Sequence, residues 1–320
     1  MTRQELLAAL RRKNAALRGE AVLDEEATEI HESAVEATED TIEGLIVEES
    51  IAMLEERPVL PIKKDRLVLE FREQADRLKW ESRLKKFSKA IDRAIPSVGR
   101  VELTGSAKEW VGTGWIVENG VLVTNRHVAL EFAERDGEGF VFQTTDDGER
   151  IRAHTDFAQE IDGTAAAVRF ELVRPLWVED LPGPDVAFFE IRAPSSAVKL
   201  PPPLKLAAVP TATPDAGTIG YPAHDSRIAM PEEMNRIFGG TYNRKRFAPG
   251  GVSQVTETRL EHDCTTLGGN SGSVVLDLET GQALGLHFSG SFLDRNYAVR
   301  SDVVRRILDG VKAGRTRVPE

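Results

Sequence analysis

The sequence has a single cysteine, Cys264, among its 320 residues. One cysteine cannot form an internal disulfide or build a cysteine-rich metal site, and this is typical of proteins from a reducing compartment. The sequence also lacks an apolar run long enough to span a bilayer, and residues 1–20 carry charges every few positions, unlike a signal peptide. We therefore expect a cytoplasmic protein that makes no use of a membrane.

An excess of basic charge is missing as well, because the formal net charge is -11. Contacts with phosphate need a basic surface, so the composition argues against nucleic-acid binding. The charge is uneven: residues 20–56 carry 14 acidic side chains and no Lys or Arg, whereas residues 57–95 are basic. No His or carboxylate pair stands at metal-ligand spacing, so we expect neither a metal nor another cofactor.

The first 95 or so residues have a helical pattern of apolar positions. In the acidic segment these positions are Ala27, Ile30, Ala34, Thr38, Ile42 and Leu45. Residues 1–57 are predicted to form an acidic helical region that is regulatory or docks a partner. Residues 58–96 are predicted to form a Pro-rich linker and then a basic amphipathic helix from Asp65 to Pro96 that packs on the rest of the chain. The apolar stripe of this helix is Phe71, Ala75, Leu78, Leu84, Phe87, Ile91 and Ile95. A helical hairpin packed on its own domain remains an alternative.

From residue 97 onward the apolar period changes to two. Short segments rich in Val, Ile, Phe and Trp alternate with turn signals such as "TTDDGER" and "DLETGQ". This pattern predicts an all-β domain of barrels or a sandwich, and "PPP" at 201–203 is the expected linker between two β-subdomains. Only residues 301–312 return to a helical pattern, capped by Ser301 or Asp302.

The stretch "GTGWIVENGVLVTNRHVA", residues 112–129, predicts a β-hairpin that leads to a histidine. Its turn is expected at Asn119 and Gly120, and His127 follows the second strand. A histidine beside an apolar strand is more often a packing residue than a catalytic one, so its role depends on the partners that the chain supplies.

Two further stretches offer such partners. In "DCTTLGGNSGSVVLD", Ser271 lies among glycines that let the backbone turn tightly, so that several amides can point into one space. The same letters also suit a plain hairpin turn. In "GPDVAFFEI", Asp185 begins an apolar strand and is either a turn cap or a buried orienting carboxylate. We prefer Asp185 to Asp162 or Asp180 because of the apolar strand that follows it.

Together, "TNRHVA", "DVAFFEI" and "GGNSGS" occur in the order His, Asp, Ser, and they resemble the trypsin-like serine proteases of the chymotrypsin fold over about residues 98–312. "GTGW", "GYP" and "GLH" are most similar to bacterial glutamyl endopeptidases and related intracellular trypsin-like peptidases. The resemblance implies a mainly β fold of two antiparallel barrels. Within a protease domain at 97–312, it places barrel one at about 97–200, barrel two at about 201–300 and a C-terminal helix at about 301–312.

The resemblance also implies a role for each motif residue. His127 would be the general base, Asp185 would fix its tautomer, and Ser271 would be the nucleophile that forms an acyl-enzyme. The amides of Gly269 and Ser271 would form the oxyanion hole. Trypsin has an aspartate before the serine that pairs with a newly cut amino terminus, whereas this chain has Asn270, so activation by that route is not expected.

The substrate pocket can be placed by the same resemblance. In glutamyl endopeptidases a threonine and a histidine line this pocket, and the matching positions are Thr266 and His287. This implies a preference for acidic residues before the scissile bond. Two points stand against it: His287 also suits a packed strand position, and the glutamyl enzymes use a mature amino terminus near the pocket, whereas here about 95 residues precede the barrels.

The expected function is therefore a serine endopeptidase that acts on proteins or peptides and is regulated by its N-terminal region. The alternative is an inactive or weakly active trypsin-like fold that serves as a binding or scaffold module. An α/β-hydrolase is excluded, because its triad runs in the order Ser, Asp, His and its nucleophile lies on a strand-to-helix turn.

Overall fold

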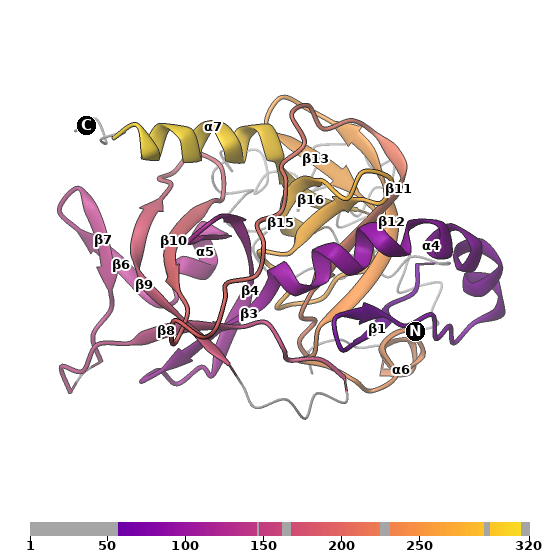
Figure 1. The fold of residues 1–320 in the computed structure, drawn as a ribbon, viewed down its shortest axis with the longest axis horizontal. Helices are drawn as coiled ribbons and strands as arrows, with labels where there is room; N and C mark the ends of the chain where they lie inside the picture. Colours follow the sequence, from indigo (N-terminus) through magenta and orange to yellow (C-terminus); the bar gives the residue numbers. More distant parts are fainter. Residues whose placement is uncertain (1–56, 146, 162–167, 225–230, 291–294, 315–320) are drawn as a thin grey trace, which may run out of the picture.

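Two β-barrels form most of the described part of the chain, and helices α4 (Gln74–Ala94) and α7 (Ser301–Lys312) lie along them (Figure 1). This computed structural model describes residues 57–145, 147–161, 168–224, 231–290 and 295–314. The helices predicted for the acidic segment lie outside the described residues. The predicted fold class is confirmed, with two antiparallel barrels and a C-terminal helix after an N-terminal helix.

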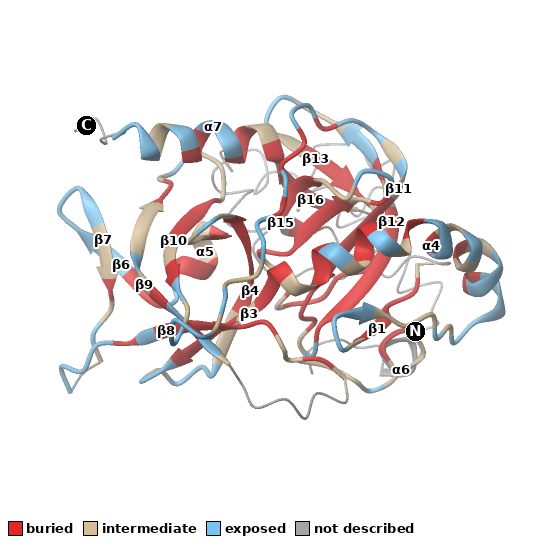
Figure 2. Ribbon diagram, viewed as in Figure 1, coloured by how far each residue is buried: buried red, intermediate tan, exposed pale blue. Residues whose placement is uncertain are grey.

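The first barrel closes through six antiparallel strands in the order β10-β5-β4-β3-β8-β9. Their bounds are β3 Val98–Thr104, β4 Trp110–Glu118, β5 Val121–Thr124, β8 Arg152–Asp156, β9 Arg169–Val178 and β10 Ala187–Arg192. A hairpin of β6 (Ala133–Asp136) and β7 (Gly139–Phe142) projects beside it, and most of this hairpin is exposed (Figure 2). Inward-facing side chains such as Ile116, Leu122 and Phe189 fill the barrel because strand residues alternate between its two faces.

The second barrel follows the order β11-β14-β15-β16-β13-β12 and closes where β11 pairs with β12. Its strands are β11 Thr213–Gly220, β12 Arg246–Val255, β13 Arg259–His262, β14 Val274–Asp277, β15 Ala283–Gly290 and β16 Asn296–Arg300. Helix α6 (Pro231–Phe238) lies between β11 and β12 in sequence. Helix α7 (Ser301–Lys312) follows β16 and buries Val303, Val304, Ile307 and Leu308, the one face that an amphipathic period provides.

Residues 57–97, here called the clasp, pack against this second barrel. Strand β1 (Leu60–Lys63) extends the barrel by pairing with β12, and β2 (Arg66–Leu67) turns back on β1. The guanidinium of Arg246 donates to the carbonyls of Val59, at 2.8 Å, and Leu60, at 3.3 Å. Helix α4 (Gln74–Ala94) and the 3-10 turn η2 (Ile95–Ser97) then lead into β3.

Helix α4 begins later than the helix predicted from Asp65. Lys64 and Asp65 have positive φ angles of 52° and 56°, and they form the turn between β1 and β2. The carboxylate of Asp92 accepts from the amide of Leu67 at 3.0 Å, which holds this turn against the helix. The apolar stripe is therefore shorter than predicted, because Leu78 is 78% exposed whereas Trp80, Leu84 and Phe87 are buried.

One apolar core joins the clasp, both barrels and helix α7. Lys245 lies at the meeting point of these parts and is fully buried. Its ammonium donates to the carbonyls of Ile95 at 3.0 Å and Phe157 at 2.6 Å, and it lies 3.8 Å from the carboxylate of Glu160. Burial lowers the pKa of Lys245 to about 8. Among the described helices, none has the length and apolar character to cross a membrane.

Candidate active site

The predicted hairpin brings His127 to the edge of the first barrel. Strands β4 and β5 pair with Ile116 opposite Leu122 and Glu118 opposite Val121, so the turn falls at Asn119 and Gly120 as predicted. Gly120 has a φ of 79°, a conformation that favours glycine. The short helix α5 (Arg126–Ala129) follows β5 and carries His127, which remains 27% exposed.

Asp185 binds His127 through both of its carboxylate oxygens. Oδ2 lies 2.5 Å from Nδ1 of the ring, and Oδ1 accepts from the backbone N–H of His127 at 3.0 Å. Two bonds to one residue fix the plane of the imidazole. They favour the tautomer that carries its proton on Nδ1, which leaves Nε2 as an acceptor.

The segment around Asp185 is held in place by the two residues before His127. The side-chain amide of Asn125 donates to the carbonyl of Asp185 at 3.0 Å, and the guanidinium of Arg126 donates to the carbonyl of Gly183 at 2.8 Å. Burial on its own raises the pKa of the Asp185 carboxyl. The charge and hydrogen bonds of His127, together with the charge of Arg126, outweigh burial and hold that pKa below its ordinary value.

The other two acidic candidates do not reach the histidine. Asp180 pairs with the guanidinium of Arg135 on strand β6, and its backbone carbonyl accepts from Arg126 at 3.3 Å. Asp162 lies outside the described residues. Of the described candidates, only Asp185 binds His127.

Ser271 lies in a tight turn of residues 267–272, here called the serine loop. Gly269 and Gly272 have φ angles of 81° and 88°. A Cβ on Gly269 would lie 2.4 Å from Cη2 of Trp110, and one on Gly272 would lie 1.9 Å from the carbonyl oxygen of Thr113. Neither position has room for a side chain, so the glycines are needed for both conformation and close packing.

The segments that carry His127 and Ser271 meet at Gly112 on strand β4. A Cβ on Gly112 would lie 2.9 Å from Cγ2 of Val128, the residue after His127, and 3.0 Å from the carbonyl oxygen of Ser271. The N–H of Thr113 also donates to that carbonyl at 2.8 Å. Within the described residues no hydrogen bond joins Ser271 Oγ to His127, and such bonds often tighten only when substrate is bound.

The backbone amides of Gly269 and Ser271 keep their donor capacity. Within the described part of the chain neither N–H donates a hydrogen bond, whereas the amides of Asn270 and Gly272 donate to the carbonyls of Leu267 and His287. Two such donors beside a nucleophile are the requirement for stabilising an oxyanion. The resemblance assigns an oxyanion hole to these two amides, and that role stays a prediction.

Asn270 is 4% exposed and is held inside the serine loop. Its amide donates to the carbonyl of Leu267 at 3.1 Å, and its Oδ1 accepts from the hydroxyl of Ser273 at 3.4 Å. Both contacts are neutral, so this conformation of the loop uses no ion pair at residue 270.

The two residues expected to line the substrate pocket are buried behind the loop. Thr266 donates its hydroxyl proton to Oδ1 of Asn296 at 2.8 Å. Nδ1 of His287 lies 3.1 Å from Nε2 of His262. Burial, followed by the neighbouring His262 and His127, holds the pKa of His287 well below its ordinary value, and burial lowers the pKa of His262 to about 3.

Two contributors were missed from the sequence. His262 belongs to none of the motifs singled out in the sequence, and it is the buried hydrogen-bond partner of His287. Thr113 had no role assigned, and it contacts the serine loop through both its amide and its hydroxyl. The small residues on either side of Thr113 in "GTG" are the signal that another backbone comes close at this point.

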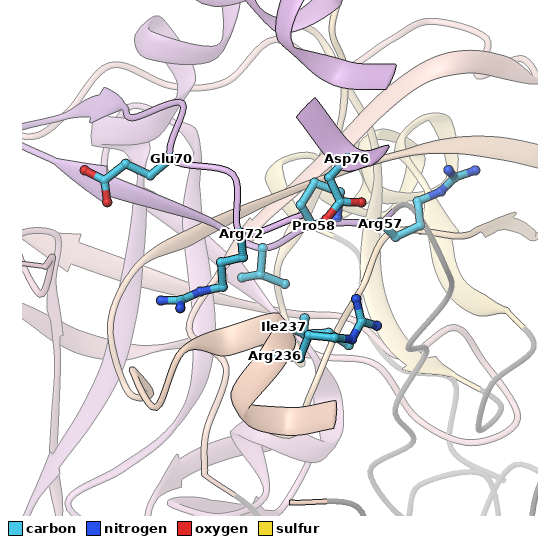
Figure 3. Close-up of a pocket in the computed structure, with 8 residues that line it drawn as sticks. Arg57, Pro58, Glu70, Arg72, Asp76, Arg236 and Ile237 are labelled. Carbon is cyan, nitrogen blue, oxygen red and sulfur yellow. The ribbon is translucent and has the colours of Figure 1, made fainter. Parts of the chain in front are cut away.

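A pocket between the clasp and helix α6 is separate from this site (Figure 3). It is lined by Arg57, Pro58, Val59, Glu70, Arg72, Asp76, Arg236 and Ile237. Its free volume of about 10 Å³ is enough for one water molecule, so it cannot hold a peptide.

A comparison of the sequence with protein families gives one match. Residues 112–286 match the family described as the trypsin-like peptidase domain. No curated protein sequence matches the chain. Among solved structures, the chain is similar to one titled "Crystal structure of Deg5", with 19% identity over 74% of this chain and 98% of that chain and a TM-score of 0.49. It is also similar to the serine endoprotease from Yersinia pestis, with 19% identity over 72% of this chain and 68% of that chain and a TM-score of 0.45.

Proposed function

Because this chain belongs to the trypsin-like peptidase family and is a serine-type endopeptidase, we propose that His127, Asp185 and Ser271 act as one catalytic unit. The contact between Asp185 and His127 is the observation that carries this proposal. It orients the ring and leaves Nε2 as an acceptor, as the general base of a triad requires.

The proposed reaction follows from these positions. Nε2 of His127 takes the proton of Ser271 Oγ as that oxygen attacks the scissile carbonyl carbon. The carbonyl oxygen becomes an oxyanion that the N–H groups of Gly269 and Ser271 stabilise. When the C–N bond breaks, His127 gives its proton to the leaving amine and an acyl-enzyme remains. Water then attacks this ester with His127 as base, and the acid and free Ser271 are released.

The test is labelling with a fluorophosphonate probe, read by mass spectrometry, together with turnover of a protein substrate such as casein. Ser271→Ala is expected to abolish labelling and to lower turnover by up to about a millionfold, the loss known for the serine of subtilisin. Ser301→Ala is the matched control. Ser301 is the first residue of α7, and the substitution removes a buried hydroxyl that donates to the carbonyl of Ala207. Labelling at another serine, or equal labelling of Ser271→Ala, would refute the assignment.

We further propose a preference for acidic residues before the scissile bond, supported by the resemblance at Thr266 and His287. Two contacts weigh against it. The Thr266 hydroxyl proton is engaged by Asn296, and the lowered pKa values of His262 and His287 keep both rings neutral, so neither supplies positive charge. Cleavage sites mapped in a proteome-derived peptide library decide the matter. Cleavage mainly after Lys, Arg or large apolar residues would refute the preference.

A regulatory role for residues 1–57, exercised on the enzyme itself or through a protein partner, is also part of the proposal. Its support is the separation of charge between the acidic segment and the basic residues that follow. A cytoplasmic location is proposed on the single cysteine, Cys264, which is buried. Cell fractionation tests the location, and truncation tests the regulation.

A further inference from the structure

Thr113 contacts the serine loop at two separate backbone positions. Its N–H donates to the carbonyl of Ser271 at 2.8 Å, and its hydroxyl donates to the carbonyl of Gly269 at 2.8 Å. The same hydroxyl oxygen accepts from the N–H of Tyr221 at 3.3 Å. Thr113 is fully buried on strand β4 of the first barrel, whereas Tyr221 follows β11 of the second. One side chain therefore ties the loop to both barrels.

The contacts around Thr113 determine where the loop amides point. In a trans peptide the C=O and N–H lie on opposite sides, so binding the carbonyl of one residue sets the direction of the next N–H. The carbonyl of Gly268 accepts from the N–H of Ala223 at 2.6 Å, which directs the N–H of Gly269 away from that contact. The carbonyl of Asn270 accepts from the N–H of Ser273 at 2.8 Å, which sets the N–H of Ser271 in the same way.

The peptide that joins Gly269 to Asn270 lies between the two peptides that carry these N–H groups. The Thr113 hydroxyl donates to its carbonyl oxygen. Gly269 has no side chain to restrict its torsions, so a peptide plane next to it can rotate at low cost. A rotation there would change the angle between the N–H groups of Gly269 and Ser271, which must converge on one oxygen. The bond from Thr113 to the Gly269 carbonyl opposes that rotation.

We propose that Thr113 is a positioning residue, whose hydroxyl keeps the amides of Gly269 and Ser271 convergent in the absence of an ion pair at Asn270. The proposal rests on the proposed function, in which these amides stabilise the oxyanion. Thr113 touches no reacting atom and acts only through the backbone of the serine loop. A hydroxyl suits this role because it can donate to the Gly269 carbonyl of the serine loop and accept from the Tyr221 amide at the same time.

The experiment compares Thr113→Val with Thr113→Ser in the full chain. Valine keeps the shape but leaves the Gly269 carbonyl and the Tyr221 amide without their partner, whereas serine keeps the hydroxyl. Thr218→Val is the matched control, since Thr218 is 2% exposed and its hydroxyl donates to the Val274 carbonyl at 2.9 Å within barrel two. Saturation kinetics of the fluorophosphonate probe give its apparent affinity and its maximal labelling rate separately, and the melting temperature of each variant reports folding.

Thr113→Val is expected to lower the maximal labelling rate by about tenfold to a hundredfold, the effect of a small misplacement of catalytic groups, with little change in apparent affinity. Thr113→Ser should restore most of the rate, and Thr218→Val should lose melting temperature but not rate. If Thr113→Val does not fold, Thr113→Ala and Thr218→Ala are compared in the same way.

The outcomes separate this inference from the function on which it rests. Absence of labelling at Ser271 in the unaltered protein would overturn the proposed function and this inference together. Normal labelling of the unaltered protein, with an unchanged maximal rate in a folded Thr113→Val or Thr113→Ala variant, would overturn only the role of Thr113. A rate loss that Thr218→Val reproduces would also overturn it, because the effect would then belong to any buried hydroxyl.

Discussion

In the candidate active site the hydrogen-bonded pair of His127 and Asp185 is partly exposed, whereas beside the clasp the charge of Lys245 is enclosed completely. His127 is 27% exposed and has a single side-chain partner, Asp185, among the described residues. Lys245 has no exposed surface, and two carbonyls and a carboxylate surround its ammonium. Both sets of contacts join elements from distant parts of the sequence.

The two places differ in how many of their hydrogen-bonding groups have a partner within the protein. In the candidate site, Nε2 of His127 and the amides of Gly269 and Ser271 make no hydrogen bond within the described residues. Around Lys245 the protein supplies the partners itself, so the contact can hold the structure together but cannot bind anything else. Burial and a shifted pKa therefore do not identify a catalytic group, because the most buried cation in this comparison has a structural role.

The largest expected effect comes from removing the clasp. A chain that begins at residue 97 loses Leu60, Ile62, Trp80, Leu84 and Ile91 from the shared core. Each such side chain is worth about 1.5–3 kcal/mol when fully buried, and their sum is comparable to the whole stability of a typical domain, about 5–15 kcal/mol. We expect this chain not to fold, as judged by circular dichroism and thermal melting.

The matched truncation begins at residue 57 and keeps the clasp. We expect it to melt like the full chain and to be at least as active, because the clasp retains all of its described contacts. A loss of activity in this shorter chain would show that residues 1–56 contribute to catalysis or substrate capture. Stable folding of the chain that begins at 97 would show that the clasp is dispensable and that Lys245 does not hold the barrels together through it.

The clasp is also where prediction from the sequence was least complete. The apolar period gave the C-terminal half of helix α4, where Leu84, Phe87 and Ile91 are buried as predicted. It could not give the strand β1 or the turn at Lys64 and Asp65, because strand pairing with β12 depends on residues almost 190 positions away. Local patterns carry no information about such partners.

The barrels and the hairpin turn were predicted for the opposite reason, whereas the contact between His127 and Asp185, which lie 58 positions apart, was predicted from the resemblance to trypsin-like proteases. Alternating apolar strands, a turn at Asn119 and Gly120, and glycines around Ser271 are local features that leave a direct signature in the sequence. The glycines beside Thr113 indicate a close backbone, but the hydrogen-bond partners of Thr113 and His262 leave no signature, because they come from elsewhere in the chain.

The second effect in size is expected from Asp185→Asn. The amide would donate rather than accept at Nδ1 of His127 and so favour the wrong tautomer, which costs about 10⁴-fold in turnover in trypsin. Glu102→Gln is the comparison, because Oε2 of Glu102 lies 3.1 Å from Nε2 of His154 in a buried pair of the same barrel. Casein turnover should be nearly unchanged in Glu102→Gln. Equal losses in the two variants would mean that the His127 pair has no special role.

The third prediction concerns Lys245→Met, which removes the enclosed charge. Glu160 and two carbonyls would lose their partner, and breaking a buried pair in this way costs about 3–5 kcal/mol. The lowered pKa of Lys245, about 8 against 10.5 for a free lysine, means that the unfolded chain binds more protons between these values. This group's contribution to the free energy of unfolding therefore rises with pH across that window.

Urea unfolding at pH 8 and pH 10 measures both parts of the third prediction. The unaltered protein should gain stability from Lys245 as the pH rises, and Lys245→Met should lack that gain. Arg135→Met is a useful control because it removes an exposed cation from the β6 hairpin. An unchanged unfolding free energy in Lys245→Met would show that the contact with Ile95, Phe157 and Glu160 does not hold the clasp to the barrels.

The smallest effect is expected from Asn270→Asp, which puts a charge into the serine loop. The side chain is 4% exposed, and its amide now donates to the Leu267 carbonyl at 3.1 Å. A carboxylate there would face that carbonyl oxygen with no proton to donate, and an unsatisfied buried group costs about 1–3 kcal/mol. Burial would also raise the pKa of the new carboxyl, so the loss should be smaller at pH 5 than at pH 7, because protonation restores a donor.

Melting temperatures at the two pH values test this last prediction, and Asn119→Asp is its control, because Asn119 is exposed in a hairpin turn that accepts either residue. We expect the fluorophosphonate labelling rate of Asn270→Asp to fall at pH 7, since the loop would shift to relieve the charge. A faster rate would have the opposite meaning. The loop would then contain a cation able to pair with residue 270, and the neutral contacts of Asn270 would not be the arrangement that supports catalysis.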